Sequence, residues 1–313
     1  MGKKKNNGMG SVTAALLANL VVAISKFVAF LFSGLTAMMN ESIHSLVDCG
    51  NQVLLLIGDK KSKNLASSTH PFGETRAKYF YSTVVAMMLF FGGGALGIME
   101  AIKKIAEGNH SIENPYLVLI VLVFGVIVEG SSLRVAFKEI KELNNDNLPI
   151  LKFLRESRHS EIIIVFAEDF CAVVGLAMAF IGTILSMVTH NSFYDTFSGL
   201  LIGIMLCLVA VLLAKEFYGL LIGESVTDTD LKIIESAFEY PDVQRVIDIK
   251  TIHLSAIDIL ITAKIELTEN HITKSSHLIN QIEATIRQGL TDEKAYIYIE
   301  LDQFDENYSH PFI

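Results

Sequence analysis

The chain has 313 residues, 51% of them hydrophobic, and a formal net charge of −9 at pH 7. Its mean hydropathy of +0.45 does not suit a soluble globular protein, and the negative charge argues against nucleic acid as a partner. The three cysteines, Cys49, Cys171 and Cys207, lie in apolar runs without a CxxC pair. They therefore indicate small buried hydrophobes and no disulfide framework.

Apolar residues crowd into the first 222 residues. Six segments meet the ~20-residue criterion for crossing a bilayer, roughly 12–33, 35–58, 80–102, 115–137, 161–189 and 196–222. Lys3, Lys4 and Lys5 precede the first apolar run, but no clear cleavage site follows it, so we interpret this run as a membrane helix instead of a signal peptide.

Lysine and arginine are unevenly distributed over the loops. The link at 190–195 has neither, and the link at 103–114 has only Lys103 and Lys104. The positive-inside rule then predicts a multi-pass protein with both termini in the cytoplasm, and we expect it in a bacterial inner membrane. The opposite loops carry Lys60, Lys61, Lys63, Arg76 and Lys78, and Lys138, Lys141, Lys152, Arg155 and Arg158.

The second span carries a stripe of polar side chains. Asn40, His44, Asp48 and Asn51 follow one another at spacings of four, four and three. An ionisable group at membrane depth costs at least ~2.5 kcal/mol, so it usually faces a cavity, a partner or an ion. His44 and Asp48 lie on one helical face and can approach the same divalent cation. They predict half of a metal site. Asn40 and Asn51 are either accessory groups of that site or form hydrogen bonds between helices.

The fifth span carries a second acidic pair, Glu168 and Asp169. Adjacent helical positions point about 100° apart, so these carboxylates cannot share one narrow face. Beside His44 and Asp48 they would supply one nitrogen and two or three oxygens, a set that fits Zn and also accepts Mn, Fe or Co. Neighbouring carboxylates near a cation change their proton affinity with its presence, which a metal–proton exchanger needs.

Other polar residues leave alternatives open. Glu129 in the fourth span is either an accessory group of the metal site or a hydrogen-bonding group between helices. Lys26 in the first span either snorkels or pairs with a carboxylate. After the second span, His70 and Glu74 either hold a metal at the cytoplasmic mouth or belong to a turn before the next helix. The glycines Gly92, Gly93 and Gly94 would allow close helix contact or bending.

Residues 224–313 have mixed composition and predict a small α+β domain, about 90 residues that can fold alone. Helices are expected over 228–239, with Asp228 or Thr229 as N-cap, and over 277–290. Strands are expected over 246–254, 257–267 and 295–301. The order αββαβ gives a sheet with one face covered by helices. This domain follows a transmembrane transport domain of residues 1–223 in the sequence.

The chain resembles the cation diffusion facilitators, a family of divalent-metal/proton antiporters, over nearly its whole length. The resemblance rests on the six spans, the sequence from His44 to Asp48, the sequence His70-Pro71-Phe72-Gly73, Asp195 at the start of span six and the α+β tail. It implies a six-helix membrane domain with a ferredoxin-like cytoplasmic domain. It also implies a transport site of paired ligands from spans two and five.

The resemblance is incomplete at the proposed ligands. Asp169 falls at the family's aspartate of span five, but Val165 occupies the position of the usual first ligand. The adjacent Glu168 resembles a branch of the family that carries Glu-Asp at this place. The loop site of relatives uses an acid and two histidines, of which only His70 matches here, with Ser67 and Glu74 at the other positions.

The tail also departs from the metal-binding pattern of relatives. Its strands carry Ile247, Lys264 and Glu300, with only Asp302 retained. Lys264 would repel a cation, so we expect little metal affinity there. The resemblance instead implies that the tail is a dimerisation and regulatory module.

The sequence therefore predicts a homodimeric transporter, not an enzyme, that exports a divalent transition metal in exchange for protons. Zn is the first expectation, and Mn, Fe or Co are alternatives; no cofactor is bound permanently. His44, Asp48 and Asp169 bind the metal, with Glu168 as fourth ligand or proton carrier. The alternative is a membrane scaffold or regulatory subunit that keeps the fold without transport. An intramembrane hydrolase lacks a supporting motif such as HExxH or GxSxG.

Overall fold

The structure is a computed structural model, and it describes residues 8–108, 115–144, 149–156, 160–255, 257–268, 275–290 and 293–304. The described residues form two compact units. The helical unit contains those up to Leu65 and those from Ala77 to Tyr218, and the sheet unit contains Ala66–Arg76 and those from Gly219 onward. The sheet unit thus includes a loop from between two membrane helices as well as the tail. The division into a transport and a dimerisation domain stays a prediction.

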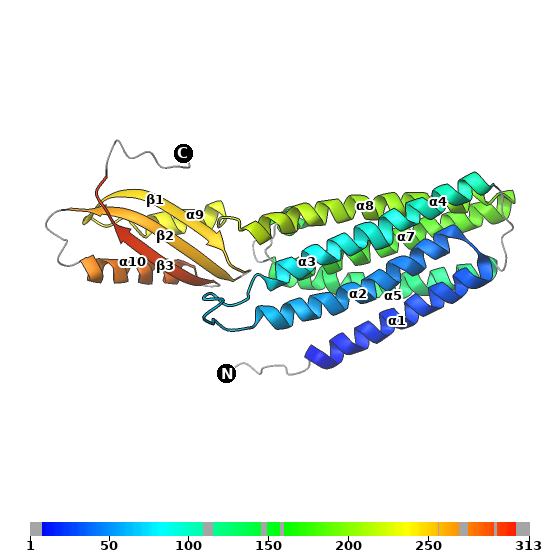
Figure 1. Ribbon diagram of the computed structural model, residues 1–313, viewed down its shortest axis with the longest axis horizontal. Helices are drawn as coiled ribbons and strands as arrows, with labels where there is room; N and C mark the ends of the chain where they lie inside the picture. The colour runs from blue at the N-terminus through cyan, green and yellow to red at the C-terminus, as the bar shows by residue number, and fades with distance from the viewer. Residues whose placement is uncertain are drawn as a thin grey trace. The chain divides into compact units, whose positions relative to one another are not determined.

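Long helices running alongside one another make up the helical unit (Figure 1). The second helix, α2, contacts α1, α3, α4 and α7, so the predicted polar stripe lies on a helix that packs against several others. The helices are α1 (Gly8–Ser33), α2 (Thr36–Ser62), α3 (Ala77–Met88), the π-helix η1 (Leu89–Ala95), α4 (Leu96–Glu107), α5 (Pro115–Leu143), α6 (Ile150–Glu156), α7 (Ser160–Thr189) and α8 (Phe193–Ile222).

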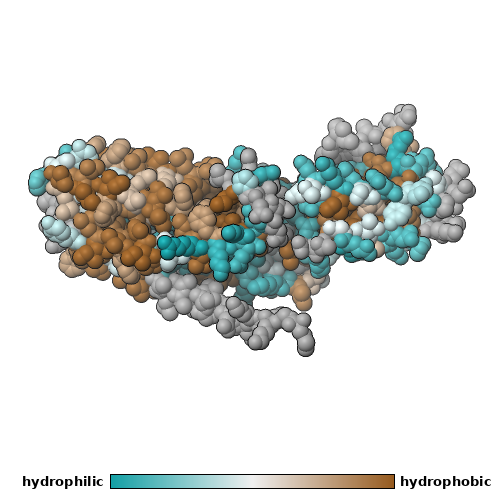
Figure 2. All heavy atoms as spheres, turned by 180° about the vertical axis from the view of Figure 1, so that it is seen from behind, coloured by the Kyte–Doolittle hydropathy of each residue, from teal (hydrophilic) through white to brown (hydrophobic). Residues whose placement is uncertain are grey.

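Four described helical segments are long and apolar enough to cross a bilayer, namely Ala77–Glu107, Tyr116–Leu143, Ile162–Thr189 and Phe193–Ile222. They confirm four of the predicted spans. The described apolar part of α1, Asn19–Ser33, is shorter. The helix α2 is continuous, but its polar stripe interrupts its apolar sequence. The visible surface of the helical unit is largely hydrophobic (Figure 2), as expected for helices that face lipid.

The predicted third span is continuous but contains the π-helix η1 over its glycine run. A Cβ atom built on Gly94 would lie 2.9 Å from the backbone nitrogen of Cys207 and 3.0 Å from the carbonyl oxygen of Gly203, both in α8. A side chain does not fit at this distance, so glycine lets the two helix backbones approach closely. The expectation of close contact at the glycine run is confirmed.

Asp195 at the start of α8 supplies a cap for a different helix. Its carboxylate Oδ2 accepts a hydrogen bond from the backbone N–H of Thr36 at 2.7 Å, whereas Leu35, the residue before α2, offers no side-chain cap. The backbone N–H of Asp195 in turn donates to Ser186 Oγ of α7 at 2.9 Å. A carboxylate at a helix N-terminus satisfies free N–H groups and the helix dipole. Asp195 therefore ties α2, α7 and α8 together.

The sheet unit follows the predicted order of elements. It contains α9 (Asp228–Ser236), β1 (Val243–His253), β2 (Asp258–Leu267), α10 (Ser275–Gly289) and β3 (Lys294–Leu301). The strand order is β1-β2-β3, with β1 antiparallel and β3 parallel to β2.

Both helices of the sheet unit share one core with β2. Ile259 and Ile261 of β2 are buried in the same cluster as Ile234 of α9 and Ile282 of α10. Buried side chains at every second residue of β2 lie on one face of the sheet, so the one-face packing is as expected.

The N-cap of α9 differs from the prediction. Thr227 is the cap: its Oγ1 accepts a hydrogen bond from the backbone N–H of Asp230 at 3.2 Å. Asp228 and Thr229 lie inside the first turn, so both predicted caps were wrong. The reason is geometric, because a capping side chain must come from the extended residue that precedes the helix.

Candidate functional site

His44 and Asp48 lie one turn apart on α2, as their spacing predicts. His44 Nδ1 lies 3.5 Å from Asp48 Oδ1, and both residues are buried. In the described part of the chain, the two ring nitrogens of His44 have no hydrogen-bond partner, and the same holds for Oδ1 of Asp48. Buried polar atoms without partners are uncommon. One nitrogen of the neutral imidazole and the carboxylate oxygen each offer a lone pair that a metal ion can use.

The two carboxylates of α7 turn towards different helices. Glu168 Oε1 accepts a hydrogen bond from Asn51 Nδ2 of α2 at 2.5 Å. Asp169 Oδ2 accepts one from Ser132 Oγ of α5 at 2.7 Å. This divergence is the one expected for adjacent helical positions. Each carboxylate is held by a donor from the helix that it faces.

The four predicted metal ligands do not form a closed cluster. Within the described ranges, no group of three or more His, Cys, Asp or Glu side chains could hold a metal ion. The structure brings His44 and Asp48 together, but it holds Glu168 on Asn51 and Asp169 on a serine hydroxyl. Binding by all four would require the α7 carboxylates to leave these donors.

The two asparagines of the polar stripe have different surroundings. Asn40 Nδ2 donates to the carbonyl oxygen of Gly199 in α8 at 2.8 Å, which supports its role as a hydrogen bond between helices. Asn51 holds Glu168, so it positions one of the predicted ligands.

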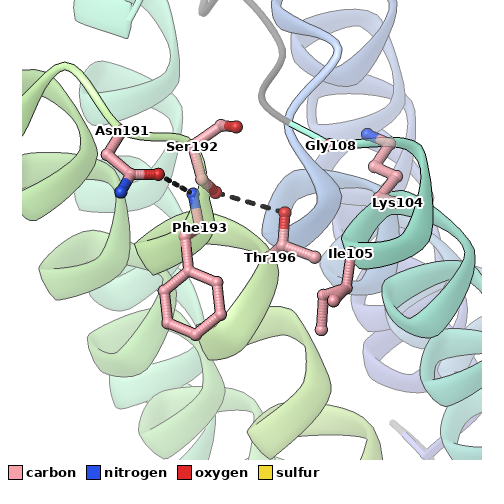
Figure 3. Close-up of a pocket in the computed structure, with 7 residues that line it drawn as sticks. All are labelled: Lys104, Ile105, Gly108, Asn191, Ser192, Phe193 and Thr196. Atoms are coloured by element: carbon pink, nitrogen blue, oxygen red, sulfur yellow. Dashed lines mark hydrogen bonds between the residues drawn. The ribbon is translucent and has the colours of Figure 1, made fainter.

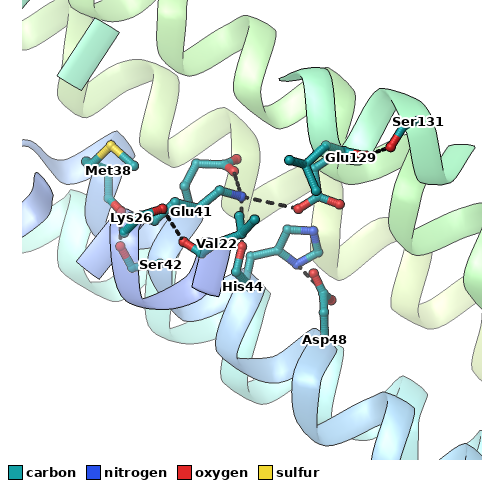
Figure 4. Close-up of polar contacts among 12 residues, drawn as sticks. Val22, Lys26, Met38, Glu41, Ser42, His44, Asp48, Glu129 and Ser131 are labelled. Carbon is teal, nitrogen blue, oxygen red and sulfur yellow. Dashed lines mark hydrogen bonds and ion pairs between the residues drawn. The ribbon is translucent and has the colours of Figure 1, made fainter. Parts of the chain in front are cut away.

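Lys26 of α1 is the centre of a second polar cluster. Figure 4 shows it beside His44 and Asp48, which we call the metal pair. Its Nζ donates to Glu41 Oε2 at 3.0 Å and to Ser45 Oγ at 2.7 Å. It also lies 3.6 Å from Glu129 Oε1. The side chains of Lys26 and Glu41 are 0% exposed. Of the two alternatives for Lys26, the structure supports pairing with carboxylates, and Glu129 is one of them.

Glu41 is the site residue that the sequence interpretation missed. The signal was its spacing, because Glu41, His44, Ser45 and Asp48 occupy positions i, i+3, i+4 and i+7. These positions share one helical face. The face that carries the metal pair therefore also carries the main partner of Lys26.

The loop after α2 forms a turn in the sheet unit. The carbonyl oxygen of His70 accepts hydrogen bonds from the N–H groups of Gly73 at 2.9 Å and Ser67 at 3.0 Å. Phe72 packs edge-to-face on Tyr296 with ring centroids 5.4 Å apart. His70 itself is exposed. These contacts support the turn, and the metal alternative with Glu74 gains no third ligand among the residues described.

In the tail, Lys264 lies between Glu300 and Asp302, the two acids considered above as possible metal ligands. Its Nζ lies 2.7 Å from Asp302 Oδ2 and 3.5 Å from Glu300 Oε1. The hydrogen bond lowers the pKa of the Asp302 carboxyl below its usual value and raises the pKa of Lys264. The geometry agrees with the expectation that Lys264 disfavours a cation there.

A small open pocket of about 130 Å³ lies where α4 ends and α8 begins (Figure 3). Asn191 Oδ1 accepts the backbone N–H of Phe193 at 2.9 Å, and Thr196 Oγ1 donates to the carbonyl oxygen of Ser192 at 3.2 Å. These bonds belong to the first turn of α8. The lining residues include no histidine or carboxylate and do not suit a metal: Lys104, Ile105, Gly108, Asn191, Ser192, Phe193 and Thr196.

A comparison with known families assigns the membrane part of the chain. Residues 12–222 match the family model of the cation efflux transmembrane domain. The chain belongs to the cation efflux, or cation diffusion facilitator, family. Membership confirms the resemblance inferred from the motifs, and it fits membrane metal transport.

Several named relatives are similar to the chain. The human proton-coupled zinc antiporter SLC30A9, mitochondrial, is 26% identical over 266 residues, which are 84% of this chain and 47% of that protein. Metal tolerance protein C4 of Arabidopsis thaliana is 28% identical over 222 residues, or 71% and 48%. The chain thus spans about half the length of these two relatives. Magnetosome protein MamB of Magnetospira sp. is 24% identical over 276 residues, or 79% and 92%.

Proposed function

We propose that the protein exports a divalent transition metal from the cytoplasm in exchange for protons. The observation that carries this proposal is the His44–Asp48 pair, which is buried in α2. Among the residues described, both imidazole nitrogens and one carboxylate oxygen of this pair have no hydrogen-bond partner. A neutral imidazole and a carboxylate are typical ligands of Zn²⁺, and they also bind Mn²⁺, Fe²⁺ or Co²⁺. The name of the human relative, a proton-coupled zinc antiporter, supports zinc and protons.

In this proposal the metal first binds His44 and Asp48. Asp169 then leaves the hydroxyl of Ser132 and becomes the third ligand. Glu168, released from Asn51, becomes the fourth ligand or carries a proton. Protonation of the carboxylates on the outward side releases the metal, because a proton and a metal compete for the same oxygen lone pairs.

The surrounding architecture completes the proposal. α1 and α2 act as spans one and two, and their enclosed polar groups Lys26 and Glu41 face other helices instead of lipid. Both termini are cytoplasmic in a bacterial inner membrane. Spans one, two, four and five rock against three and six, and the tail is a ferredoxin-like module that joins two copies of the chain.

The test is metal flux into proteoliposomes under an imposed pH gradient. Zn²⁺ flux should follow the proton gradient in the unmodified protein and disappear in Asp48→Ala and Asp169→Ala. Asp59→Ala is the matched control, because Asp59 lies on the same helix but pairs with Lys63 at its exposed end. Normal flux in both site variants would contradict the proposed site. No flux of Zn²⁺, Mn²⁺, Fe²⁺ or Co²⁺ in the unmodified protein would favour the scaffold alternative.

A further inference from the structure

We infer that Glu41 and Glu129 form a second cation position beside the metal pair, and that the ammonium group of Lys26 occupies it as a tethered cation. The role that this gives Lys26, closing the position to metal, rests on the proposed transport function. The position itself rests on the geometry alone.

The oxygen atoms around Lys26 come from two other helices. Glu41 Oε2 and Ser45 Oγ of α2 lie 3.0 and 2.7 Å from Nζ, and Glu129 Oε1 of α5 lies 3.6 Å away. Carboxylate and hydroxyl oxygens are also ligand types that a hard divalent ion such as Mn²⁺ or Mg²⁺ accepts, together with water. The ammonium group therefore stands where a metal ion would find oxygen ligands.

Charge favours a cation at this position. The carboxylates of Glu41 and Glu129 are buried, and a buried charge without a partner is strongly unfavourable. Lys26 contributes one positive charge to these two negative groups. If its ammonium group is removed, the two carboxylates have to take up protons or bind another cation.

A free oxygen and a glycine complete the position. Glu41 Oε1 is buried and has no hydrogen-bond partner in the described part of the chain. A Cβ atom built on Gly175 of α7 would lie 2.5 Å from this oxygen. The glycine therefore leaves room for a carboxylate oxygen that Lys26 does not use.

The position adjoins the proposed transport site. Glu41 lies one turn from His44 and Ser45 on the same face of α2. In Figure 4 the imidazole of His44 lies between the carboxyl groups of Glu129 and Asp48. In the proposed orientation the N-terminal end of α2 is the outward end, so a departing metal passes the Glu41–Glu129 position. A tethered ammonium there prevents the metal from binding a second time on its way out.

Equilibrium dialysis of the purified full chain against Mn²⁺ tests the inference. Lys26→Met should bind one Mn²⁺ per chain more than the unmodified protein, and Lys26→Arg should bind no more. Adding Glu41→Gln and Glu129→Gln to Lys26→Met should remove the gain. The double variant Lys26→Met/Asp48→Ala should bind one Mn²⁺ more than Asp48→Ala alone. Asp48→Ala removes a ligand of the transport site only.

The outcomes separate this inference from the proposed function. Lys26→Met without an additional ion, or a gain that persists in the triple variant, would overturn it. Failure of Lys26→Met to purify at any Mn²⁺ concentration would also overturn it, because Mn²⁺ in the vacated position should restore the charge balance. Absence of Zn²⁺, Mn²⁺, Fe²⁺ and Co²⁺ flux in the unmodified protein would contradict the transport proposal and leave the dialysis result unaffected.

Discussion

The helical unit and the sheet unit each hold a lysine between two carboxylates, but only the helical unit encloses it. Lys26 lies 3.0 and 3.6 Å from its acids, and Lys264 lies 2.7 and 3.5 Å from its own. The side chain of Lys26 is 0% exposed, whereas that of Lys264 is 22% exposed and its partner Asp302 is 46% exposed. Two clusters with nearly the same distances therefore have different surroundings.

The difference shows that burial, and not distance, decides what such a cluster does. Exposed ion pairs contribute little, because water solvates each charge when the partner is removed. A buried pair is different, since removal of one partner leaves a charge that no solvent reaches. Lys26 therefore has a structural and electrostatic role that Lys264 cannot have.

The largest predicted effect is that of Lys26→Met measured without added divalent cations. It should lower the free energy of unfolding by about 3–5 kcal/mol, the usual cost of removing one partner from a buried ion pair. Chemical unfolding in detergent micelles, followed by circular dichroism, measures this change. Stability equal to that of the unmodified protein would break the comparison between the two units.

A control for this prediction is Lys26→Met combined with Glu41→Gln and Glu129→Gln. These changes remove both buried carboxylates together with the ammonium group. Most of the lost stability should return, because a neutral cluster has no unpaired charge to bury. Mn²⁺ should stabilise the single variant more than this control, in which only the transport site can bind the ion.

The second prediction concerns the space beside Glu41. Gly175→Ala would place a methyl group 2.5 Å from Glu41 Oε1, so the carboxylate has to shift from the position in which its Oε2 accepts the hydrogen bond of Lys26. We expect a loss of about 1–3 kcal/mol, as for other overpacked sites, in the same unfolding measurement. Gly130→Ala on α5 is the matched control, since its Cβ meets no atom within 4 Å. Equal stability of the two variants would show that Glu41 does not depend on this space.

The third prediction concerns the sheet unit, where single local bonds matter more than enclosed charges. Thr227→Ala removes the side chain that accepts the N–H of Asp230 and should cost about 1 kcal/mol, as for other N-caps. Hydrogen exchange of α9 in the full chain should become faster. Thr229→Ala, an exposed residue of the same turn, should leave the exchange unchanged. Equal exchange in both variants would show that Thr227 is not the effective cap.

The sheet unit could be predicted almost completely from the sequence, because its signals are local. Alternating apolar residues such as Ile259 and Ile261 mark β2, and helical spacing marks α10. The error at the N-cap of α9 has a local cause as well, since Thr227, Asp228 and Thr229 are all capping residue types. One residue of displacement decides which side chain reaches the N–H groups.

The candidate site could be predicted only in part, because its contacts join helices that are far apart in the sequence. The His44–Asp48 pair lies on one helix and follows from spacing. The contacts of Glu168 with Asn51 and of Asp195 with Thr36 depend on helix packing, which periodicity does not encode. Glu41 lies on the predicted face of α2, but its partner Lys26 comes from α1, so only the fold reveals the second cluster.

The smallest predicted effect is that of Lys264→Met, which should change the stability of the full chain by less than the error of the unfolding measurement. The pKa of Asp302 is lowered. The contribution of its carboxylate to folding stability is therefore present above the unfolded-state pKa and is lost as the pH falls through the folded-state pKa. The pKa of Lys264 is raised, so its contribution is lost only as the pH rises through the folded-state value. Any effect of the substitution should therefore be constant across neutral pH.

The same variant gives the sharpest form of the comparison when Mn²⁺ binding is measured. Glu300 and Asp302 remain in water after Lys264→Met, and water together with salt screens their charges. No additional Mn²⁺ should be retained in equilibrium dialysis, in contrast to Lys26→Met. If both variants gained an ion of equal affinity, the arrangement of the two carboxylates would be sufficient for binding, and burial would not be the deciding factor.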